Sequence, residues 1–466
     1  MPGKFEAPRG KKKGGGLLVV VVILLLAVMI FAAVWLLKQE RVPEETLPTD
    51  GMTQAPTQPS ETETQPPETT APEPEHVVST ATVSATGDIL MHMPLITAGA
   101  QGNGNYNFDY IFQYLKEYSE ATDYAVANLE TTLAGTAKPY QGNPLFNCPD
   151  EIADAAKNAG FDMLLTANNH SVDTGKNGYL RTLEVVRAAG LETLGTMQSA
   201  EDPRYAIQDV NGIRLGMICY TYDTSSTTGG KLSLNGNPMT GLTRDNINSY
   251  DFNNPQPMYD EVAGYLEEMK EAGVEATILF IHWGPQEYSL TPLEAHTRIA
   301  QKFCDMGIDV VIGGHPHVVQ PMDLLTSNED PSHKTVVLYS MGNAVSNQRL
   351  GKITRIKTAH TEDGVWFSVT FSKYSDGTVY LDSVDLIPTW VYLNQKYYIL
   401  PLDKEKEDQW GAMFDIGDNT VNAAKNSYQR TMELVGEGLT KCQDYLEESR
   451  EQREADYLAA VMPNAA

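Results

Sequence analysis

The chain has 466 residues, of which 41% are hydrophobic, and a formal net charge of −27 at pH 7. This apolar share is sufficient for a large buried core, while the excess of acids excludes a protein that binds nucleic acid through a basic surface. The four cysteines lie far apart without a C-x-x-C pair. This spacing excludes a zinc ribbon, a thiol-redox motif and a disulfide-stapled fold, and we expect most of the cysteines to be buried free thiols.

The chain begins with a basic segment followed by a long apolar run. Residues 1–16 contain five basic side chains and one acid, and residues 17–37 are apolar throughout. A helix over 17–37, rising by about 1.5 Å per residue, spans the roughly 30 Å hydrocarbon core of a bilayer. The alternative is a cleaved secretory signal, whose apolar region is usually only about 7 to 15 residues long. We therefore expect a single-pass protein of the cell membrane, with a cytoplasmic basic tail at 1–16, a transmembrane helix at 17–37 and an extracytoplasmic main domain.

The composition changes twice after the apolar run. Residues 38–76 are rich in Pro, Thr and Glu and poor in large apolar side chains, so they predict a disordered stalk. From residue 77, short apolar runs alternate with amphipathic segments, which is typical of an α/β domain. We expect this domain at 77–400, followed at 401–466 by an acidic helical extension that either packs on the domain or mediates association.

Predicted strands and helices alternate within the domain. The strands are predicted at residues 80–89, 124–130, 163–169, 275–284, 309–314 and 335–343. The helices are predicted at residues 150–160, 177–190, 258–273 and 293–307, and three of them end in Ala-Gly, a common helix stop. Turn signals at Asn211-Gly212 and at 375–377 predict two hairpins. The hairpins indicate two sheets rather than one doubly wound sheet.

A polar cluster follows each predicted strand, at the point where the strand ends. The clusters are Gly87-Asp88, Asn128-Leu129-Glu130, Asn168-Asn169-His170, His282-Trp283-Gly284, His315-Pro316-His317 and Ser340-Met341-Gly342-Asn343. Ligands of open α/β sheets bind at this edge, because the loops there bring together side chains from distant strands. Each cluster alone has a structural alternative, such as an Asx turn at Asp88, a helix start at Asn169 or a solvated Glu130. Six clusters on one edge favour a shared site.

The donor atoms in these clusters are typical of a metal centre. His315-Pro316-His317 after two glycines is either a tight turn with incidental imidazoles or half of a metal site, and we favour the metal site. Carboxylate, amide and imidazole donors together suit Mn, Zn or Fe better than Ca²⁺ or a thiolate-bound metal. We expect two divalent transition-metal ions, bridged by a carboxylate at a separation of about 3.5 to 4 Å, which stabilise an in-line displacement.

The order of these blocks resembles the CapA (PgsA-like) capsule-synthesis family, whose domain is related to calcineurin-like metallophosphoesterases. The blocks are GDILM, ANLETTLAG, TANNHSVDTG, IHWGPQEY, VVIGGHPHVVQP and LYSMGNAVSN, all within residues 80–350. The resemblance implies a four-layer α/β/β/α sandwich of metallophosphoesterase type. It also implies a role in the synthesis, attachment or export of poly-γ-glutamate at the cell surface.

The resemblance assigns the metal ligands to the two ions. The expected ligands are Asp88 and His317 for one ion, Asn169, His282 and His315 for the other, and Glu130 as the bridge. The sequence departs from the metallophosphoesterase pattern in two ways. The usual Asp-x-His becomes Asp88-Ile89-Leu90, with the nearest histidine at His92, and a glutamate replaces the bridging aspartate.

The resemblance also implies catalytic and substrate-binding residues. His170 would be the catalytic histidine that protonates a leaving group, and Asp173 would orient it, unless Asp173 only caps the next helix. The pocket is expected to be lined by Trp283, Glu287, Tyr288 and Asn343, although the aromatic pair is equally consistent with a core position.

Three functions agree with these features. The first is a metal-dependent hydrolase or transferase that acts on the capsule polymer. The second is a non-catalytic metal-binding scaffold of the capsule synthase complex, and the third is a cell-surface phosphoesterase. The expected partners are the membrane, through residues 17–37, and either the anionic polymer or the synthase subunits, but no nucleic acid. Because the acidic body repels a polyanion, bound metal is the expected source of local positive charge.

Overall fold

The computed structural model of the chain describes residues 76–224 and 232–461. The predicted basic tail, transmembrane helix and stalk therefore lie outside the described residues, except for His76 at the end of the stalk. Within the two described ranges, no helix combines the length and the hydropathy that a membrane span requires.

Two mixed β-sheets form the centre of the domain. The first sheet has the strand order β19-β18-β17-β1-β4-β5-β6, with β16 paired to β1. Its strands are β1 (Val77–Ile89), β4 (Tyr124–Leu129), β5 (Met163–Leu165), β6 (Glu192–Leu194), β16 (Asn343–Val345), β17 (Asp363–Tyr374), β18 (Val379–Asn394) and β19 (Lys396–Pro401). Strands β1, β4, β5 and β6 run parallel, so their carboxyl ends lie at one edge.

The second sheet has the strand order β11-β8-β12-β13-β15-β14, with β7 paired to β8. Its strands are β7 (Tyr205–Val210), β8 (Ile213–Asp223), β11 (Ser249–Asp251), β12 (Ala276–His282), β13 (Val310–Gly314), β14 (Val319–Thr326) and β15 (Lys334–Met341). Four short strands form two small ribbons: β2 (Ala100–Gly102) with β3 (Asn105–Tyr106), and β9 (Ser233–Leu234) with β10 (Asn237–Pro238).

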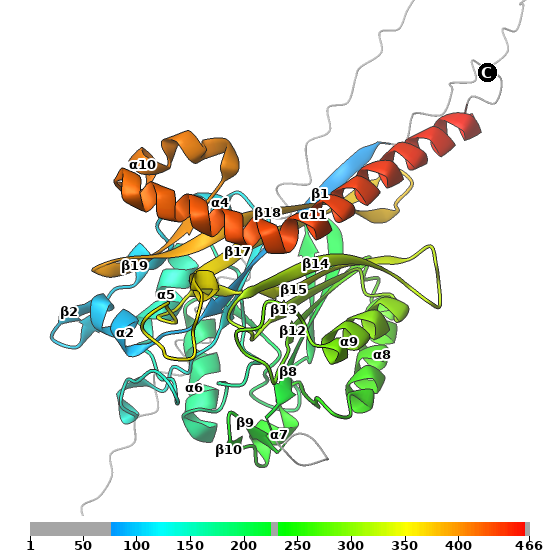
Figure 1. Cartoon of the computed structure of the whole chain (residues 1–466). Coiled ribbons are helices and arrows are strands. Elements are labelled where there is room, and N and C mark those ends of the chain that lie inside the picture. The colour runs from blue at the N-terminus through cyan, green and yellow to red at the C-terminus, as the bar shows by residue number, and fades with distance from the viewer. Residues whose placement is uncertain (1–75, 225–231, 462–466) are drawn as a thin grey trace, which may run out of the picture. The chain divides into compact units, whose positions relative to one another are not determined.

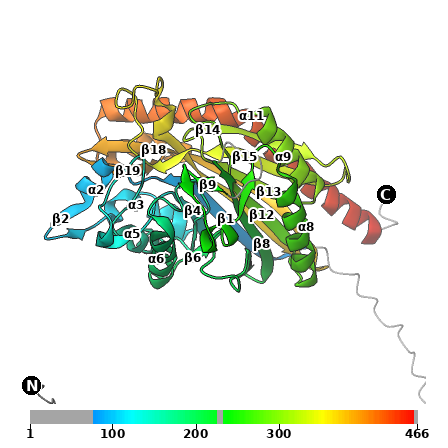
Figure 2. The same cartoon turned by 90° about the horizontal axis from the view of Figure 1, so that it is seen from below.

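Helices cover the outer face of each sheet, as Figures 1 and 2 show. Those on the first sheet are α2 (Met93–Gly99), α3 (Asp109–Phe112), α4 (Lys116–Glu120), α5 (Glu151–Asn158) and α6 (Gly175–Ala188), and those on the second are α8 (Gln256–Glu271) and α9 (Glu294–Asp305). The remaining helices are α7 (Leu242–Asp245), α10 (Trp410–Met413), α11 (Asp418–Val461) and the 3-10 turns η1 (Gly135–Ala137), η2 (Ala359–Glu362) and η3 (Lys404–Gln409). The four-layer α/β/β/α sandwich implied by the resemblance is confirmed.

The core between the sheets consists of the inward-facing half of each strand. Val83 and Phe367 from the first sheet meet Phe280 and Ile312 from the second, and all four are at most 2% exposed. Because side chains alternate along a strand, the opposite faces pack against the outer helices. Each fully buried large apolar side chain stabilises the fold by about 1.5–3 kcal/mol relative to an exposed one. This packing fixes the distance between the two sheets and hence the geometry of their shared edge.

The long helix α11 packs across one side of the sandwich and contacts β14 and β18, one strand from each sheet (Figure 1). Its residues Val435, Leu439, Cys442 and Leu446 belong to the core between the sheets. Helix α11 therefore belongs to the same compact unit as the sandwich.

Both predicted hairpins are present. β7 and β8 join at Asn211-Gly212, where both residues have positive φ values of 54° and 82°, as a type I′ turn requires. β17 and β18 join through residues 375–378, with Gly377 at a φ of 89°.

Candidate metal centre

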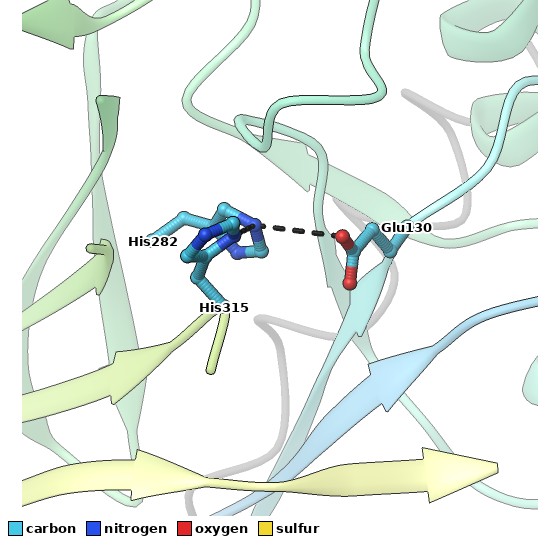
Figure 3. Close-up of side chains that lie close together, drawn as sticks. All are labelled: Glu130, His282 and His315. Carbon is cyan, nitrogen blue, oxygen red and sulfur yellow. Dashed lines mark hydrogen bonds and ion pairs between the residues drawn. The ribbon is translucent and has the colours of Figure 1, made fainter. Parts of the chain in front are cut away.

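Strands from both sheets end at a common edge, and the predicted ligands lie there. From the first sheet, Asp88 lies at the end of β1 and Glu130 directly follows β4. From the second, His282 ends β12 and His315 directly follows β13. Figure 3 shows the Glu130 carboxylate facing the rings of His282 and His315 across the space between the sheets.

The turn that carries two of the histidines has an unusual backbone. His315 and His317 have φ values of 96° and 57°, in the left-handed region that side chains other than glycine rarely adopt. Such positions cost on the order of 1–3 kcal/mol each and concentrate at functional sites. The preceding Gly313 has no room for a side chain, since a Cβ there would lie 2.1 Å from both Trp283 Nε1 and Tyr339 O. The local sequence is therefore adapted to bring two imidazoles to this edge.

Asp88 is fully buried and held by two neighbours. Its Oδ1 accepts a hydrogen bond from Asn128 Nδ2 at 2.7 Å, and its Oδ2 lies 3.1 Å from His317 Nδ1. Burial alone would raise the pKa of Asp88, but the hydrogen bond and charge of His317, assisted by His282 and Asn128, hold it below its usual value. Asp88 is thus an ionised oxygen donor.

Glu130 has the opposite environment. Its side chain is 0% exposed, and among the residues that the structure describes neither carboxylate oxygen has a hydrogen-bond donor. The nearest cationic candidates are nitrogens of His282, His170 and His317, at 3.5, 3.8 and 3.9 Å. Burial and then the charge of Asp88 raise the pKa of Glu130 well above its usual value. A buried carboxylate without a partner is costly unless a cation completes its environment.

The donor atoms fall into two overlapping groups, in each of which three of them lie within 4.8 Å of one another. The groups are Asp88, Glu130 and His317, and Glu130, His282 and His315. Asn169 joins the second group, since its Oδ1 lies 2.7 Å from His282 Nε2. Burial lowers the pKa of His282 to about 3 and that of His315 well below its usual value, so both rings are neutral and keep a lone pair for a metal. The residues present fit two divalent ions that share Glu130, as in the predicted arrangement.

His170 lies beside these groups with one nitrogen fixed. Its Nδ1 lies 2.6 Å from Asp173 Oδ2, and its Nε2 faces Glu130 Oε1 at 3.8 Å. Asp173 is itself held, because its Oδ2 also accepts from the backbone N–H of Phe146 at 2.7 Å. Asp173 therefore orients His170 and directs Nε2 toward the metal centre. The alternative in which Asp173 caps helix α6 is not observed, since Thr174 occupies the N-cap.

Four residues were expected to line the substrate pocket, and two of them lie near the predicted metal ligands, where a role in substrate binding stays a prediction. The ring centroid of Tyr288 is 6.2 Å from that of His317, and the side chain of the neighbouring Glu287 is 33% exposed. The prediction that Trp283 lines the pocket is wrong. It is fully buried on the other face of β12, where it stacks on His296 and donates from Nε1 to Tyr339 O at 2.8 Å.

The prediction that Asn343 lines the substrate pocket is also wrong. Its Nδ2 lies 3.3 Å from His317 O, 3.0 Å from Gln348 Oε1 and 2.9 Å from Thr361 O, and its Oδ1 lies 3.2 Å from His317 Nδ1. Asn343 is 0% exposed, so it positions His317 rather than contacting substrate.

No neighbouring residue takes over the role of the histidine in the usual Asp-x-His pattern. Leu90 stands in its place and is buried in the fold. His92 directs Nδ1 to Leu90 O at 3.2 Å and packs edge-on against Phe146, and burial lowers its pKa to about 4. The described contacts thus give His92 a structural role beside the site.

Several residues of the site were not predicted. Phe146 packs edge-on against His170 with a centroid distance of 4.7 Å, and the ring of Tyr222 lies 4.8 Å from that of His315. Asn235 and Asn237 point their amides at Asp173 Oδ1, at 3.4 and 3.2 Å. The Asn-Gly-Asn sequence predicts a turn between β9 and β10, but the sequence contains no signal for where this turn packs.

Comparison with known proteins places these residues in a family context. A family model described as bacterial capsule synthesis protein PGA_cap matches residues 82–348, more than half of the chain. The capsule biosynthesis protein CapA of Bacillus anthracis is 27% identical over 312 residues, which cover 66% of this chain and 67% of that protein. The PGA biosynthesis protein CapA of Bacillus subtilis is 26% identical over 273 residues, which cover 57% and 63%. The chain thus spans about two thirds of the length of these relatives.

Among solved structures, a 5′-nucleotidase precursor from Thermus thermophilus aligns with a TM-score of 0.39 and 15% identity, over 76% of this chain and 59% of that one. The family match covers all six polar clusters, so it includes all the predicted ligands. The chain belongs to the family of bacterial capsule synthesis proteins.

Proposed function

We propose that this protein acts at the cell surface in the synthesis, attachment or export of a poly-γ-glutamate capsule, and that its metal centre serves a hydrolase or transferase reaction. The family membership and the names of its CapA relatives support the polymer. The apolar run at 17–37, preceded by basic residues, supports a membrane anchor with the domain outside the cytoplasm.

The single observation that carries the metal-dependent reaction is the environment of Glu130. This fully buried carboxylate has no hydrogen-bond donor within residues 76–224 and 232–461. It lies among three histidines, at distances too long for hydrogen bonds and too short for unrelated positions. It belongs to both groups of donor atoms. A bridging ligand between two cations accounts for all of these features.

The residues around the centre supply the remaining chemistry. Divalent ions held by Asp88, Glu130, Asn169, His282, His315 and His317 would act as Lewis acids toward an amide or phosphoester oxygen of the substrate. Asp173 Oδ2 accepts from Nδ1–H of His170, which fixes the ring with Nε2 toward the metal centre. His170 in its protonated form then donates from Nε2 to the leaving group. Phe146 packs against the His170 ring and limits the access of water to it.

The first test measures the metal content of the purified full-length protein. Elemental analysis after reconstitution with Mn, Zn or Fe is expected to find bound metal in the wild type and none in His315→Ala/His317→Ala. A control pair with the same number of histidines removed, His76→Ala/His333→Ala, lies away from the centre and retains the metal. A wild type without metal after reconstitution would contradict the proposed site.

The second test separates a catalyst from a scaffold. His170→Ala is expected to reduce polymer production or turnover by about 10²- to 10⁴-fold, because it removes the proton donor. Metal content stays at the wild-type level, because His170 is not among the two groups of donor atoms. Normal polymer from this variant would reject the catalytic role and favour the metal-binding scaffold.

A further inference from the structure

A loop with the opposite charge to the rest of the chain lies beside the metal centre. Residues 349–357 contain four basic side chains and no acid, in a chain of net charge −27. The loop follows β16 and precedes η2, and it forms part of the yellow segment in Figure 1. A local concentration of positive charge on an acidic body marks a place where an anion is attracted rather than repelled.

The start of this loop is fixed to the site by hydrogen bonds. Gln348 Nε2 lies 3.2 Å from Tyr288 Oη, and its Oε1 accepts from Asn343 Nδ2 at 3.0 Å. Arg349 is 13% exposed, pairs with Glu362 at 2.5 Å and donates to Val391 O at 2.6 Å. Arg349 is therefore structural, and it anchors the loop from which Arg355 projects.

Arg355 differs from Arg349 in that most of its side chain is accessible. The side chain is 69% exposed, and its guanidinium carbon lies 5.5 Å from the ring centroid of Tyr288. The same ring lies 6.2 Å from that of His317, so one aromatic ring separates Arg355 from a residue of the metal centre. A cation–π contact of this kind holds the guanidinium in place without using its N–H donors.

The contacts of Arg355 leave room for another anion. Its Nη2 lies 3.3 Å from Glu287 Oε2, while a guanidinium carries five N–H donors in a fixed fork. Among the described residues, this single contact to Glu287 is the ion pair that Arg355 makes, so the other edge of the fork remains available. An edge of this geometry binds a carboxylate or a phosphate through two parallel hydrogen bonds.

We propose that Arg355 binds a carboxylate of the polymer substrate and thereby positions the chain at the metal centre. This inference rests on the proposed function and specifies how that site recognises its substrate. Tyr288 forms the support for Arg355 on one side and faces His317 on the other. A polymer with one free carboxylate per residue offers an anion to Arg355 while a neighbouring amide reaches the metal centre.

Arg298 provides a matched control. It lies in α9, its Nη1 pairs with Glu294 Oε1 at 2.6 Å, and its side chain is 65% exposed. Arg355→Ala and Arg298→Ala therefore remove the same charge from equally exposed arginines, each with one glutamate partner. Any difference between the two variants reports on position and not on net charge.

The experiment measures the dissociation constant of fluorescent oligo-γ-glutamate for the metal-loaded full-length protein at fixed salt. We expect Arg355→Ala to weaken binding by about 10- to 100-fold, as for a lost charge-assisted hydrogen bond. Arg298→Ala stays within about twofold of the wild type, in line with an exposed charge away from the site. Arg355→Lys keeps the charge but loses the forked guanidinium, so its dissociation constant is expected to lie between those of the wild type and Arg355→Ala. Metal content, measured in parallel, is the same in all four proteins.

Each other outcome overturns a distinct statement. Equal binding by wild type and Arg355→Ala rejects the role of Arg355 and leaves the proposed function intact. Equal weakening by both alanine variants also rejects it, because only net charge then matters. A metal-loaded wild type that does not bind the oligomer rejects both the polymer substrate and this inference. If inorganic phosphate binds more tightly than the oligomer and this binding is lost in Arg355→Ala, the ligand of Arg355 is a phosphate and the proposed carboxylate is rejected.

Discussion

The two sheets contribute different donor atoms to the metal centre and stabilise them in different ways. The first sheet supplies the oxygen donors Asp88, Glu130 and Asn169, and the second supplies the nitrogen donors His282, His315 and His317. On the oxygen side, Asn128 binds Asp88 at 2.7 Å and Asn168 binds Asn128 at 3.1 Å. On the nitrogen side, burial lowers the pKa values of His282 and His315, so these two rings are neutral.

This difference indicates that neither sheet holds an ion alone. Each group of donor atoms combines carboxylate oxygens from the first sheet with imidazole nitrogens from the second, so the charge that neutralises a cation and the nitrogen donors come from different sheets. Metal affinity therefore depends on the packing between the sheets as much as on the ligands. Four predictions test the comparison, from the largest expected effect to the smallest.

Glu130→Gln is expected to have the largest effect, because Glu130 belongs to both groups of donor atoms. Elemental analysis should find about two ions per chain in the reconstituted wild type and close to none in the variant. In the metal-free proteins, the free energy of unfolding of the variant should exceed that of the wild type by about 1–3 kcal/mol, as measured by denaturant unfolding, because a buried carboxyl group without a partner among the described residues is removed. Glu294→Gln, whose side chain is 86% exposed, serves as the control for both measurements. Retention of both ions by Glu130→Gln would show that the two sides do not share this ligand.

The next prediction compares one ligand from each side. His315 and Asp88 each belong to a single group, so His315→Ala and Asp88→Asn are each expected to lose one ion and keep the other. Metal titration followed by elemental analysis should give about one ion per chain in either variant. If one substitution removes both ions, the two groups of donor atoms do not bind their ions independently.

Asn128→Ala tests the hydrogen bonds that support the oxygen side. It removes the donor to Asp88 Oδ1 and the acceptor of Asn168, so the carboxylate loses its fixed orientation. Loss of such a supporting contact weakens metal affinity by about 10- to 100-fold, which competition with a chelator measures. Asn158→Ala is the matched control, because it removes an exposed asparagine that donates to Asp109 at 3.1 Å. Equal affinity in the two variants would show that Asp88 needs no support.

His296→Gln tests the role of burial on the nitrogen side, with the smallest expected effect. His296 lies behind Trp283, accepts from Leu293 N–H and faces Gly284 O at 2.6 Å, and burial lowers its pKa. The unfolded chain therefore binds a proton at a higher pH than the folded protein. This contribution to stability is present above about pH 6.5 and declines as the pH falls toward the folded pKa.

Glutamine keeps the hydrogen-bonding capacity of His296 but does not titrate. The free energy of unfolding of His296→Gln should decline less steeply than that of the wild type between about pH 6.5 and 5, by a difference on the order of 1 kcal/mol. Urea unfolding at several pH values measures this, and the comparison cancels the contribution of the other histidines. Parallel curves for the two proteins would show that His296 is not a source of acid sensitivity.

The strands and helices that carry the site were predictable because their apolar periodicity is regular. The strand predicted at 309–314 corresponds to β13 at Val310–Gly314, and the helix predicted at 293–307 corresponds to α9 at Glu294–Asp305. The convergence of the ligands was also predictable, since the carboxyl ends of parallel strands share an edge. The roles of these ligands remain predictions until metal is measured.

Other features depend on information that the local sequence does not contain. Trp283 directly follows the inward-facing His282, so the alternation of side chains along a strand places it on the outer face, and this rule outweighs the family motif. Asn235 and Phe146 lie in loops, whose positions result from packing with distant segments. The C-terminal helix illustrates the same limit, because its amphipathic pattern does not reveal which surface it covers.

The position of α11 has a consequence for the order in which the protein matures. Strand β1, which carries Asp88, pairs with β17, as in Val83 with Val369, and α11 completes the same core with Leu446. A nascent chain therefore contains its first ligand long before it contains the segments that hold this ligand in place. We therefore expect metal to bind only after nearly the entire polypeptide has been synthesised, and chains that end before α11 to load no ion.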